Sequence, residues 1–261
     1  MGRTLGAGVG ATVLNQDIYE LSDVQKHRLG TRVQRGDCVY RYAKAIQTYT
    51  RNNMLAHSYY HQHIMYATIA VASPIGSNLV YVTVGAGDGA LNDGAFAAHD
   101  LEGGTICVQS ADDTGRYTFS IRDNNAAVSG GTMTVTIDGE LPVATVATTW
   151  HVDAIASPYL VSCTNTQDRY CFMGLPMRIA TTTLPYHWLQ TWGPAGPISQ
   201  PLVGVSSPSA PVVTVVARHD GTLDVPVTGS VCLYAQRVGY VMSVAQDGTQ
   251  GLPFVFLQIA P

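Results

Sequence analysis

Alternating apolar and polar positions recur along the chain and predict β-strands. In residues 132–138, Met, Val and Ile alternate with Thr and Asp, which is the period-2 pattern of a strand with one buried face. Residues 80–84 repeat this pattern, with Tyr and Thr on the second face. Further β-branched runs predict strands at residues 212–216, 225–228, 238–244 and 254–259.

Tight-turn signals separate these runs. Five Asp-Gly pairs occur: Asp88-Gly89, Asp93-Gly94, Asp138-Gly139, Asp220-Gly221 and Asp247-Gly248. Aspartate tolerates a positive φ and glycine adopts it freely, so such pairs favour turns between antiparallel strands. Many short strands with frequent turns predict an all-β fold, an antiparallel jelly-roll-like sandwich in one or two β lobes.

Helical periodicity is weak. Residues 43–58 fit helical spacing loosely, but their Thr and Asn residues disfavour a helix, so a short helix and a long loop stay open as alternatives. Residues 16–28 predict a helical turn attached to a flexible N-terminal arm. Two proline-rich stretches, 194–201 and 208–211, predict loops that could separate two lobes.

The expected organisation has three parts. An extended arm covers residues 1–25, and a β-rich body covers residues 26–195. The C-terminal strands at residues 196–261 belong either to the same domain or to a second small lobe.

Composition narrows the class of protein. Charged residues make up 12% of the 261 residues and hydrophobic residues 46%, whereas average domains carry roughly 25% charged residues. Disorder and coiled coils are therefore excluded. The net charge is −4 and no run of cations occurs, so we expect no nucleic-acid partner and no membrane. The longest apolar stretch, residues 64–72, is too short to span a bilayer.

The cysteines favour buried, reduced thiols. There are five, an odd number without CxxC spacing: Cys38, Cys107, Cys163, Cys171 and Cys232. A disulfide between Cys163 and Cys171 across a hairpin stays open as an alternative.

No catalytic signature is present. The Gly-rich stretch 85–90 predicts a hairpin loop, because no helix follows it to bind a phosphate. His57, His61 and His63 have spacing that suits a metal, but the tyrosines around them favour a packing or interface role. We expect no catalytic residue, no metal and no cofactor. An enzyme built from distant carboxylates remains an alternative.

Residues 186–194 combine two of the three tryptophans in one short segment. If this segment is a strand, alternate side chains from Tyr186 to Trp192 share one face. Three interpretations stay open: a core strand, an inter-subunit contact, or a surface on which sugars stack.

Six short motifs lie between residues 29 and 195: 29–33 (LGTRV), 36–45 (GDCVYRYAKA), 103–106 (GGTI), 115–117 (GRY), 121–124 (IRDN) and 188–195 (WLQTWGPA). In this order they resemble the head decoration (cement) proteins of tailed bacteriophages, with a looser match beyond residue 195. The chain departs from the family at residues 46–55, where relatives often have a Gly-rich turn.

The resemblance implies a structural role. A family member is a β-rich, commonly trimeric protein bound outside the major capsid protein lattice, where it bridges neighbouring subunits. It is found on the virion head surface after synthesis in the bacterial host cytoplasm. The alternative that we carry is a phage fibre or adhesin module that recognises host surface glycans.

Candidate contact residues follow from the arm, the family phrases and the aromatic segment. The capsid and inter-subunit candidates are Arg3, Leu5, Val9, Val13, Tyr40, Arg41, Tyr42, Tyr186, Trp188, Gln190 and Trp192.

Overall fold

The regular elements of the computed structural model are all β-strands. The residues that it describes are 16–58, 63–89, 92–110, 112, 114–163, 171–196, 214–218, 220–224, 236–243 and 254–260. They contain no helix long and apolar enough to span a membrane. The predicted all-β fold is confirmed. The described residues 46–55, where a helix or a loop was open, form a loop.

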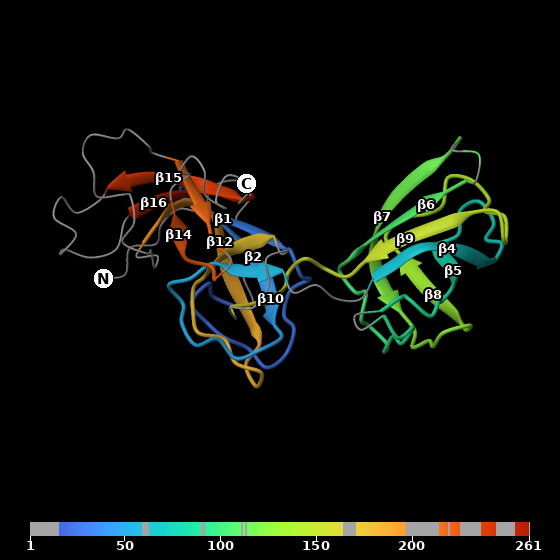
Figure 1. The fold of residues 1–261 in the computed structure, drawn as a ribbon, viewed down its shortest axis with the longest axis horizontal. Coiled ribbons are helices and arrows are strands. Elements are labelled where there is room, and N and C mark those ends of the chain that lie inside the picture. Colours follow the sequence, from blue (N-terminus) through green and yellow to red (C-terminus); the bar gives the residue numbers. More distant parts are fainter. Residues whose placement is uncertain are drawn as a thin grey trace, which may run out of the picture. The chain divides into compact units, whose positions relative to one another are not determined.

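Two compact units make up the chain. Unit 1 comprises residues 1–59 and 159–261, and unit 2 comprises residues 60–158 (Figure 1). Unit 2 is thus inserted within unit 1. This division differs from the expected one, because neither unit boundary falls near residue 25 or residue 195.

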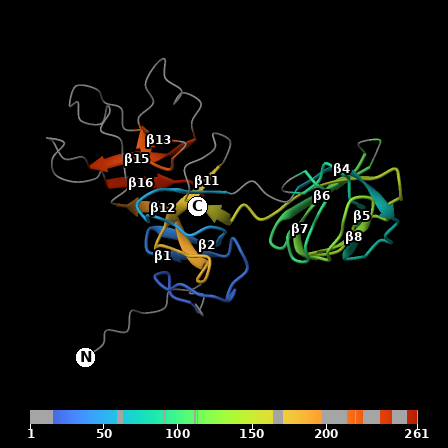
Figure 2. The ribbon, with the colours of Figure 1, turned by 60° about the horizontal axis from the view of Figure 1, so that its bottom comes forward.

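Unit 2 is a closed six-stranded barrel (Figure 2). Its strands are β4 (His63–Val71), β5 (Leu79–Thr83), β6 (Thr105–Gln109), β7 (Arg116–Asn124), β8 (Thr132–Ile137) and β9 (His151–Ile155). They pair in the order β4-β5-β8-β7-β6-β9. The strands predicted at 80–84 and 132–138 are confirmed as β5 and β8. Their alternate residues, such as Val80, Val82 and Val135, are fully buried, so each strand turns one face to the interior.

Unit 1 contains a ten-stranded sheet. Its strands are β1 (Arg32–Arg35), β2 (Cys38–Ala45), β3 (Ala56–Ser58), β10 (Leu160–Ser162), β11 (Phe172–Pro176), β12 (Tyr186–Ala195), β13 (Thr214–Ala217), β14 (Leu223–Asp224), β15 (Arg237–Ser243) and β16 (Phe254–Gln258). Strand β2 pairs with β12 as well as with β10, so the pairings β2-β10-β3-β11-β12 close into a ring. The β2–β10 pairing is parallel, whereas the other described pairings are antiparallel.

The last four strands extend this sheet from β12. Residues 192–195 of β12 pair with β16, which pairs with β15, and β15 with β13. The strands predicted near 212–216, 238–244 and 254–259 correspond to β13, β15 and β16, while residues 225–228 lie outside the described part. The described C-terminal strands therefore belong to the same sheet as the body.

The N-terminal segment packs against unit 1 from residue 16 onward. Ile18 is buried and Ser22 forms an isolated bridge with Tyr186. Of the helical turn predicted at residues 16–28, the structure shows a single hydrogen-bonded turn, in which the Glu20 N–H donates to the Asp17 carbonyl at 3.0 Å, and no helix. The part of the expected arm that the structure describes is therefore a docked, irregular segment rather than an extended one.

The predicted positive φ occurs at every described Asp-Gly pair, but only Asp220-Gly221 joins two strands that pair with each other, β13 and β14. Gly89, Gly94, Gly139 and Gly221 all have a positive φ, and Asp247-Gly248 lies outside the described residues. At Gly221 a Cβ atom would also stand only 2.5 Å from the Leu55 carbonyl oxygen. The loop after β5 is not a hairpin, however, because β5 pairs with β4 and β8 rather than with the next strand, β6.

Candidate functional site

Trp188 lies inside a buried aromatic cluster of unit 1. Its side chain is 0% exposed, and its ring stands edge-on to Tyr42 with the centroids 5.0 Å apart. The His27 ring packs 5.3 Å from the Trp188 ring and 5.1 Å from the Tyr42 ring. Ile18, Val33 and Tyr40 belong to the same cluster. Of the three interpretations of the aromatic segment, the core strand is the one that accounts for Trp188.

The Tyr42 hydroxyl fastens the N-terminal segment over this cluster. It donates a hydrogen bond to Gln16 Oε1 at 2.8 Å and accepts one from the Lys26 backbone N–H at 3.2 Å. Gln16 Nε2 donates in turn to the Tyr186 carbonyl at 3.1 Å. Burial raises the pKa of Tyr42. These groups are satisfied by the chain itself, which therefore covers its own aromatic residues.

The opposite face of β12 buries a histidine. His187 Nδ1 lies 3.0 Å from the Pro185 carbonyl oxygen, and Nε2 lies 3.1 Å from the Tyr49 hydroxyl. A carbonyl can only accept, so Nδ1 carries the proton and Nε2 accepts the Tyr49 O–H bond. Burial lowers the pKa of His187 to about 4 and raises that of Tyr49 well above its usual value. Both groups are neutral at pH 7, and their burial away from solvent makes the pair structural.

The predicted contact residues fall into three groups. Those outside the described residues are Arg3, Leu5, Val9 and Val13. Those buried within unit 1 are Tyr40, Tyr42, Trp188 and Gln190. Those half-buried are Arg41, Tyr186 and Trp192. The buried group offers no surface to a partner, because each of its side chains is at most 5% exposed, and only the half-buried group can contribute to one.

Trp192 belongs to an aromatic surface that the sequence patterns did not predict. It meets Phe256 of β16 edge-on, with the ring centroids 5.7 Å apart. Phe256 stacks in parallel on Tyr240 of β15 at 5.2 Å. Strands β15 and β16 lie beside β12 in both views (Figures 1 and 2). We call this surface the aromatic face, and its members are Trp192, Tyr240, Met242, Phe254 and Phe256.

The aromatic face is exposed while the other side of the same strands is core. Tyr240 is 37% exposed, Phe254 46% and Met242 48%. Between them, Val255 and Leu257 point to a buried cluster with Val215 and Val238. A large apolar side chain on a solvent-facing sheet surface is a signal of an interaction site when several of them are contiguous.

The sequence alone predicts the strand at residues 254–259 but not which of its two sides is exposed. Residues 254–257 read Phe-Val-Phe-Leu, so both sides of the strand are apolar and alternation alone does not say which one is exposed. The pairing of β16 with β15 and β12 decides that the phenylalanines face outward together.

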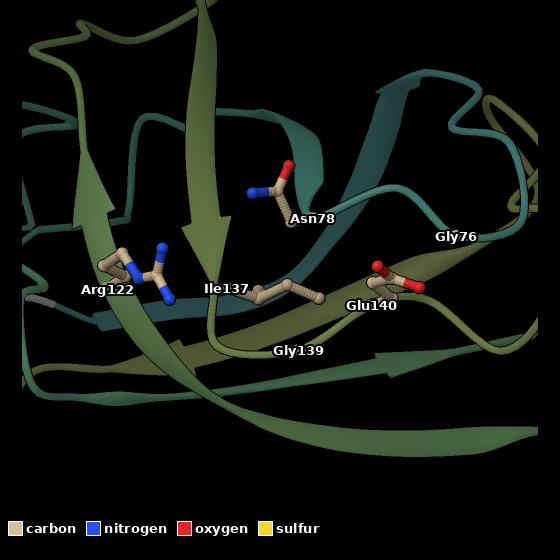
Figure 3. A pocket seen from close by; sticks show the side chains of 6 residues that line it. All are labelled: Gly76, Asn78, Arg122, Ile137, Gly139 and Glu140. Atoms are coloured by element: carbon tan, nitrogen blue, oxygen red, sulfur yellow. The ribbon is translucent and has the colours of Figure 1, made fainter.

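A separate polar pocket of about 440 Å³ opens on the barrel. Figure 3 shows the side chains of Arg122 and Glu140 on either side of Ile137. Arg122 Nε donates to Asp138 Oδ1 at 3.1 Å, at the surface. The pocket is lined by Gly76, Asn78, Arg122, Ile137, Gly139 and Glu140. Its wall is mostly polar, unlike the apolar wall that usually encloses a small molecule.

The described histidines of the sequence motif lie on different strands. His57 lies in β3 of unit 1 and His63 in β4 of unit 2, while His61 is outside the described residues. Within the described part of the chain, no three His, Cys, Asp or Glu side chains group as metal ligands. Asp112 is an exposed turn residue whose pKa is lowered to about 2 by hydrogen bonds from Ser110 and Thr114.

The cysteines described are free thiols. Cys163 is buried and Cys171 exposed, and no disulfide joins them. Burial raises the pKa of Cys163, so its reactive thiolate form is suppressed.

No family model, no curated protein and no solved structure matches this chain.

Proposed function

We propose that this chain is a structural virion protein, a capsid decoration (cement) protein. It binds the outside of the major capsid lattice, as a homo-oligomer, commonly a trimer in the family that it resembles, and bridges neighbouring subunits. The observation that carries the proposal is the aromatic face of β12, β16 and β15. It joins Trp, Tyr, Phe and Met, the residue types that are enriched in protein–protein interfaces.

The chemistry of the face favours a protein partner. Parallel stacking of Tyr240 on Phe256 and the edge contact of Trp192 hold the rings in place before any partner arrives. Rigid aromatic side chains lose little entropy on binding, so they act as anchors. Repeated attachment through an oligomer multiplies modest single contacts, which suits a protein that covers a lattice.

The experiment measures occupancy on virions. Particles made without this chain are incubated with the full-length protein, and its copies per major capsid protein are counted by quantitative mass spectrometry. We expect a ratio near one to one. The double variant Tyr240→Ser/Phe254→Ser should lower occupancy at least ten-fold without loss of the fold, because both side chains are exposed. The matched control is Tyr19→Ser, which changes an exposed tyrosine elsewhere on unit 1.

Two outcomes would overturn the proposal. A handful of copies per wild-type particle would indicate a vertex or fibre component instead. If the double variant reaches wild-type occupancy, the aromatic face is not part of the contact with the capsid.

A further inference from the structure

A bulge in β4 turns two apolar side chains out of the barrel. Strand β4 pairs with β9 through Ile64 opposite Ala154 and Ala67 opposite Val152, and the register shifts between these pairs. Met65 therefore stands in the shifted segment. It is 68% exposed, whereas Ile64 is buried. The inserted residues are released from the regular inside–outside alternation.

Tyr66, the second bulge residue, has an unusual backbone. Its φ is +52°, in the left-handed region that is unfavourable for a residue with a bulky side chain. Asp153 Oδ1 accepts the Tyr66 backbone N–H at 2.8 Å, and Asp88 Oδ1 accepts that of Met65 at 3.2 Å. Two carboxylates thus hold the strained bulge in place. Strain that the surroundings maintain in this way is characteristic of functional sites.

The strained backbone presents the Tyr66 ring as a fixed platform. The ring stacks on the His151 imidazole with centroids 4.0 Å apart and an interplanar angle of 10°. Tyr66 is nevertheless 63% exposed. Since one ring face packs against His151 and the residue is still 63% exposed, we infer that the other ring face is the one a planar or apolar ligand surface can reach.

Polar side chains continue from this platform across the outer face of the barrel. His151 pairs with Gln109 of β6, and Gln109 pairs with Arg116 of β7. Gln109 is only 8% exposed, and its Oε1 accepts a hydrogen bond from Nη2 of the exposed Arg116 at 3.2 Å, so Gln109 positions Arg116 rather than facing solvent itself. The row crosses four strands, about 14 Å at the usual strand spacing. Asp153 beside it uses Oδ1 for the Tyr66 amide, which leaves Oδ2 as an acceptor.

We propose that this platform, formed by Tyr66 stacked on His151 with Asp153 beside it and the exposed Arg116 at the far end of the row, is a saccharide-binding site. The apolar face of a sugar ring stacks on an aromatic side chain, and planar polar groups beside it hydrogen-bond the hydroxyls. The site belongs to unit 2, so it goes beyond the capsid contact proposed for unit 1 and stands without it.

A saccharide fits this platform better than a nucleic acid does. Stacking proteins for single strands combine aromatic side chains with a positively charged groove. Here the chain carries a net charge of −4, and Asp153 lies against the platform. A neutral sugar carries no negative charge for Asp153 to repel, and its hydroxyls both donate and accept hydrogen bonds.

The test uses the full-length protein on a printed array of bacterial surface polysaccharides and oligosaccharides, followed by calorimetric titration of the best ligand. Tyr66→Ala should weaken the association at least ten-fold, whereas Tyr66→Phe should keep it within about three-fold because the ring remains. Tyr19→Ala, at a comparably exposed tyrosine in unit 1, is the matched control and should not change the affinity.

A glycine variant separates binding from folding. Glycine adopts a positive φ without strain, so Tyr66→Gly should melt at the wild-type temperature or above it and yet lose binding. The proposal is overturned if no saccharide on the array binds the wild type. It is equally overturned if Tyr66→Ala binds normally while Arg122→Ala does not, since the ligand would then occupy the polar pocket.

Discussion

Two aromatic residues on strands, Trp188 of unit 1 and Tyr66 of unit 2, have opposite surroundings. Trp188 sits on a strand covered on both faces by its own chain, and its ring is inaccessible. Tyr66 sits on a barrel strand that has one interior face, and a bulge turns its ring outward. The difference shows that an aromatic segment in the sequence marks a surface only where the chain leaves one face of the strand uncovered.

The largest expected effect is in the core of unit 1. Trp188→Ala removes a fully buried indole and should lower the free energy of unfolding of unit 1 by about 3–5 kcal/mol. Because unit 2 has its own core, its transition should not move. Calorimetry of the full chain checks this, and Ile106→Ala in the barrel should give the reverse pattern. A shift of both transitions by either variant would show that the units unfold together.

Because His187 is buried in unit 1, the stability of that unit should depend on pH in a range set by the pKa of this histidine. The pKa of His187 is lowered from 6.5 to about 4 in the folded state, so the unfolded state binds more protons between these values. The stability of unit 1 should therefore fall by about 3 kcal/mol as the pH drops from about 6.5 to about 4. Denaturant titrations across this range measure it.

The control for the pH effect is His187→Gln, whose unit 1 stability should depend less steeply on pH whatever its absolute value. In the wild type, NMR titration of the His187 ring should show no protonation above about pH 5. Protonation near pH 6.5 would contradict the buried Tyr49–His187 pair.

The same Asp-Gly motif should tolerate substitution differently in the two units. A Cβ at Gly221 of unit 1 would clash with the Leu55 carbonyl, whereas Gly139 of unit 2 has open space around that position. Both have a positive φ, which costs alanine about 1–2 kcal/mol. We expect Gly221→Ala to destabilise unit 1 by at least 2 kcal/mol and Gly139→Ala to destabilise the barrel by about 1 kcal/mol. Equal losses in urea titrations would contradict the close approach to Leu55.

The smallest expected effect is at the aromatic face. Tyr240→Ser and Phe254→Ser change exposed side chains, so each should alter the stability of unit 1 by no more than about 0.5 kcal/mol. Thermal melting measures this, and it is the condition for interpreting their effect on virion occupancy as lost contact. A loss comparable to that of Trp188→Ala would mean that the face is core.

Local alternation predicted the strands of the barrel and their buried sides better than it predicted those of the sheet in unit 1. In β8 and β5 one face is interior, so the alternation of residues 132–138 and 80–84 gave both the strand and its buried side. In residues 187–191 of β12 both sides are buried, so alternation between Tyr186 and Trp192 predicted the strand but left a core strand and a contact face both open. The insertion of residues 60–158 had no local signal at all.

The candidate sites depended on contacts distant in sequence. Tyr66 is one of the tyrosines for which the sequence left a packing and an interface role both open, and its exposure arises from a bulge held by Asp88 and Asp153. Trp192 was a candidate from the sequence, but its neighbours Tyr240 and Phe256 join it only through the pairing of three strands. Periodicity relates only residues that are close in sequence, so it could not show which distant side chains join Tyr66 or Trp192.

The sequence by itself determined the all-β class, several of the strands and the positive φ of glycine in the four described Asp-Gly pairs, because these follow from side-chain alternation and from backbone preferences of single residues. The tertiary structure alone decided which aromatic residues are exposed, the inserted barrel and the docking of the N-terminal segment. Those features depend on which strands pair and on what covers each face, and such contacts join residues that no local pattern connects.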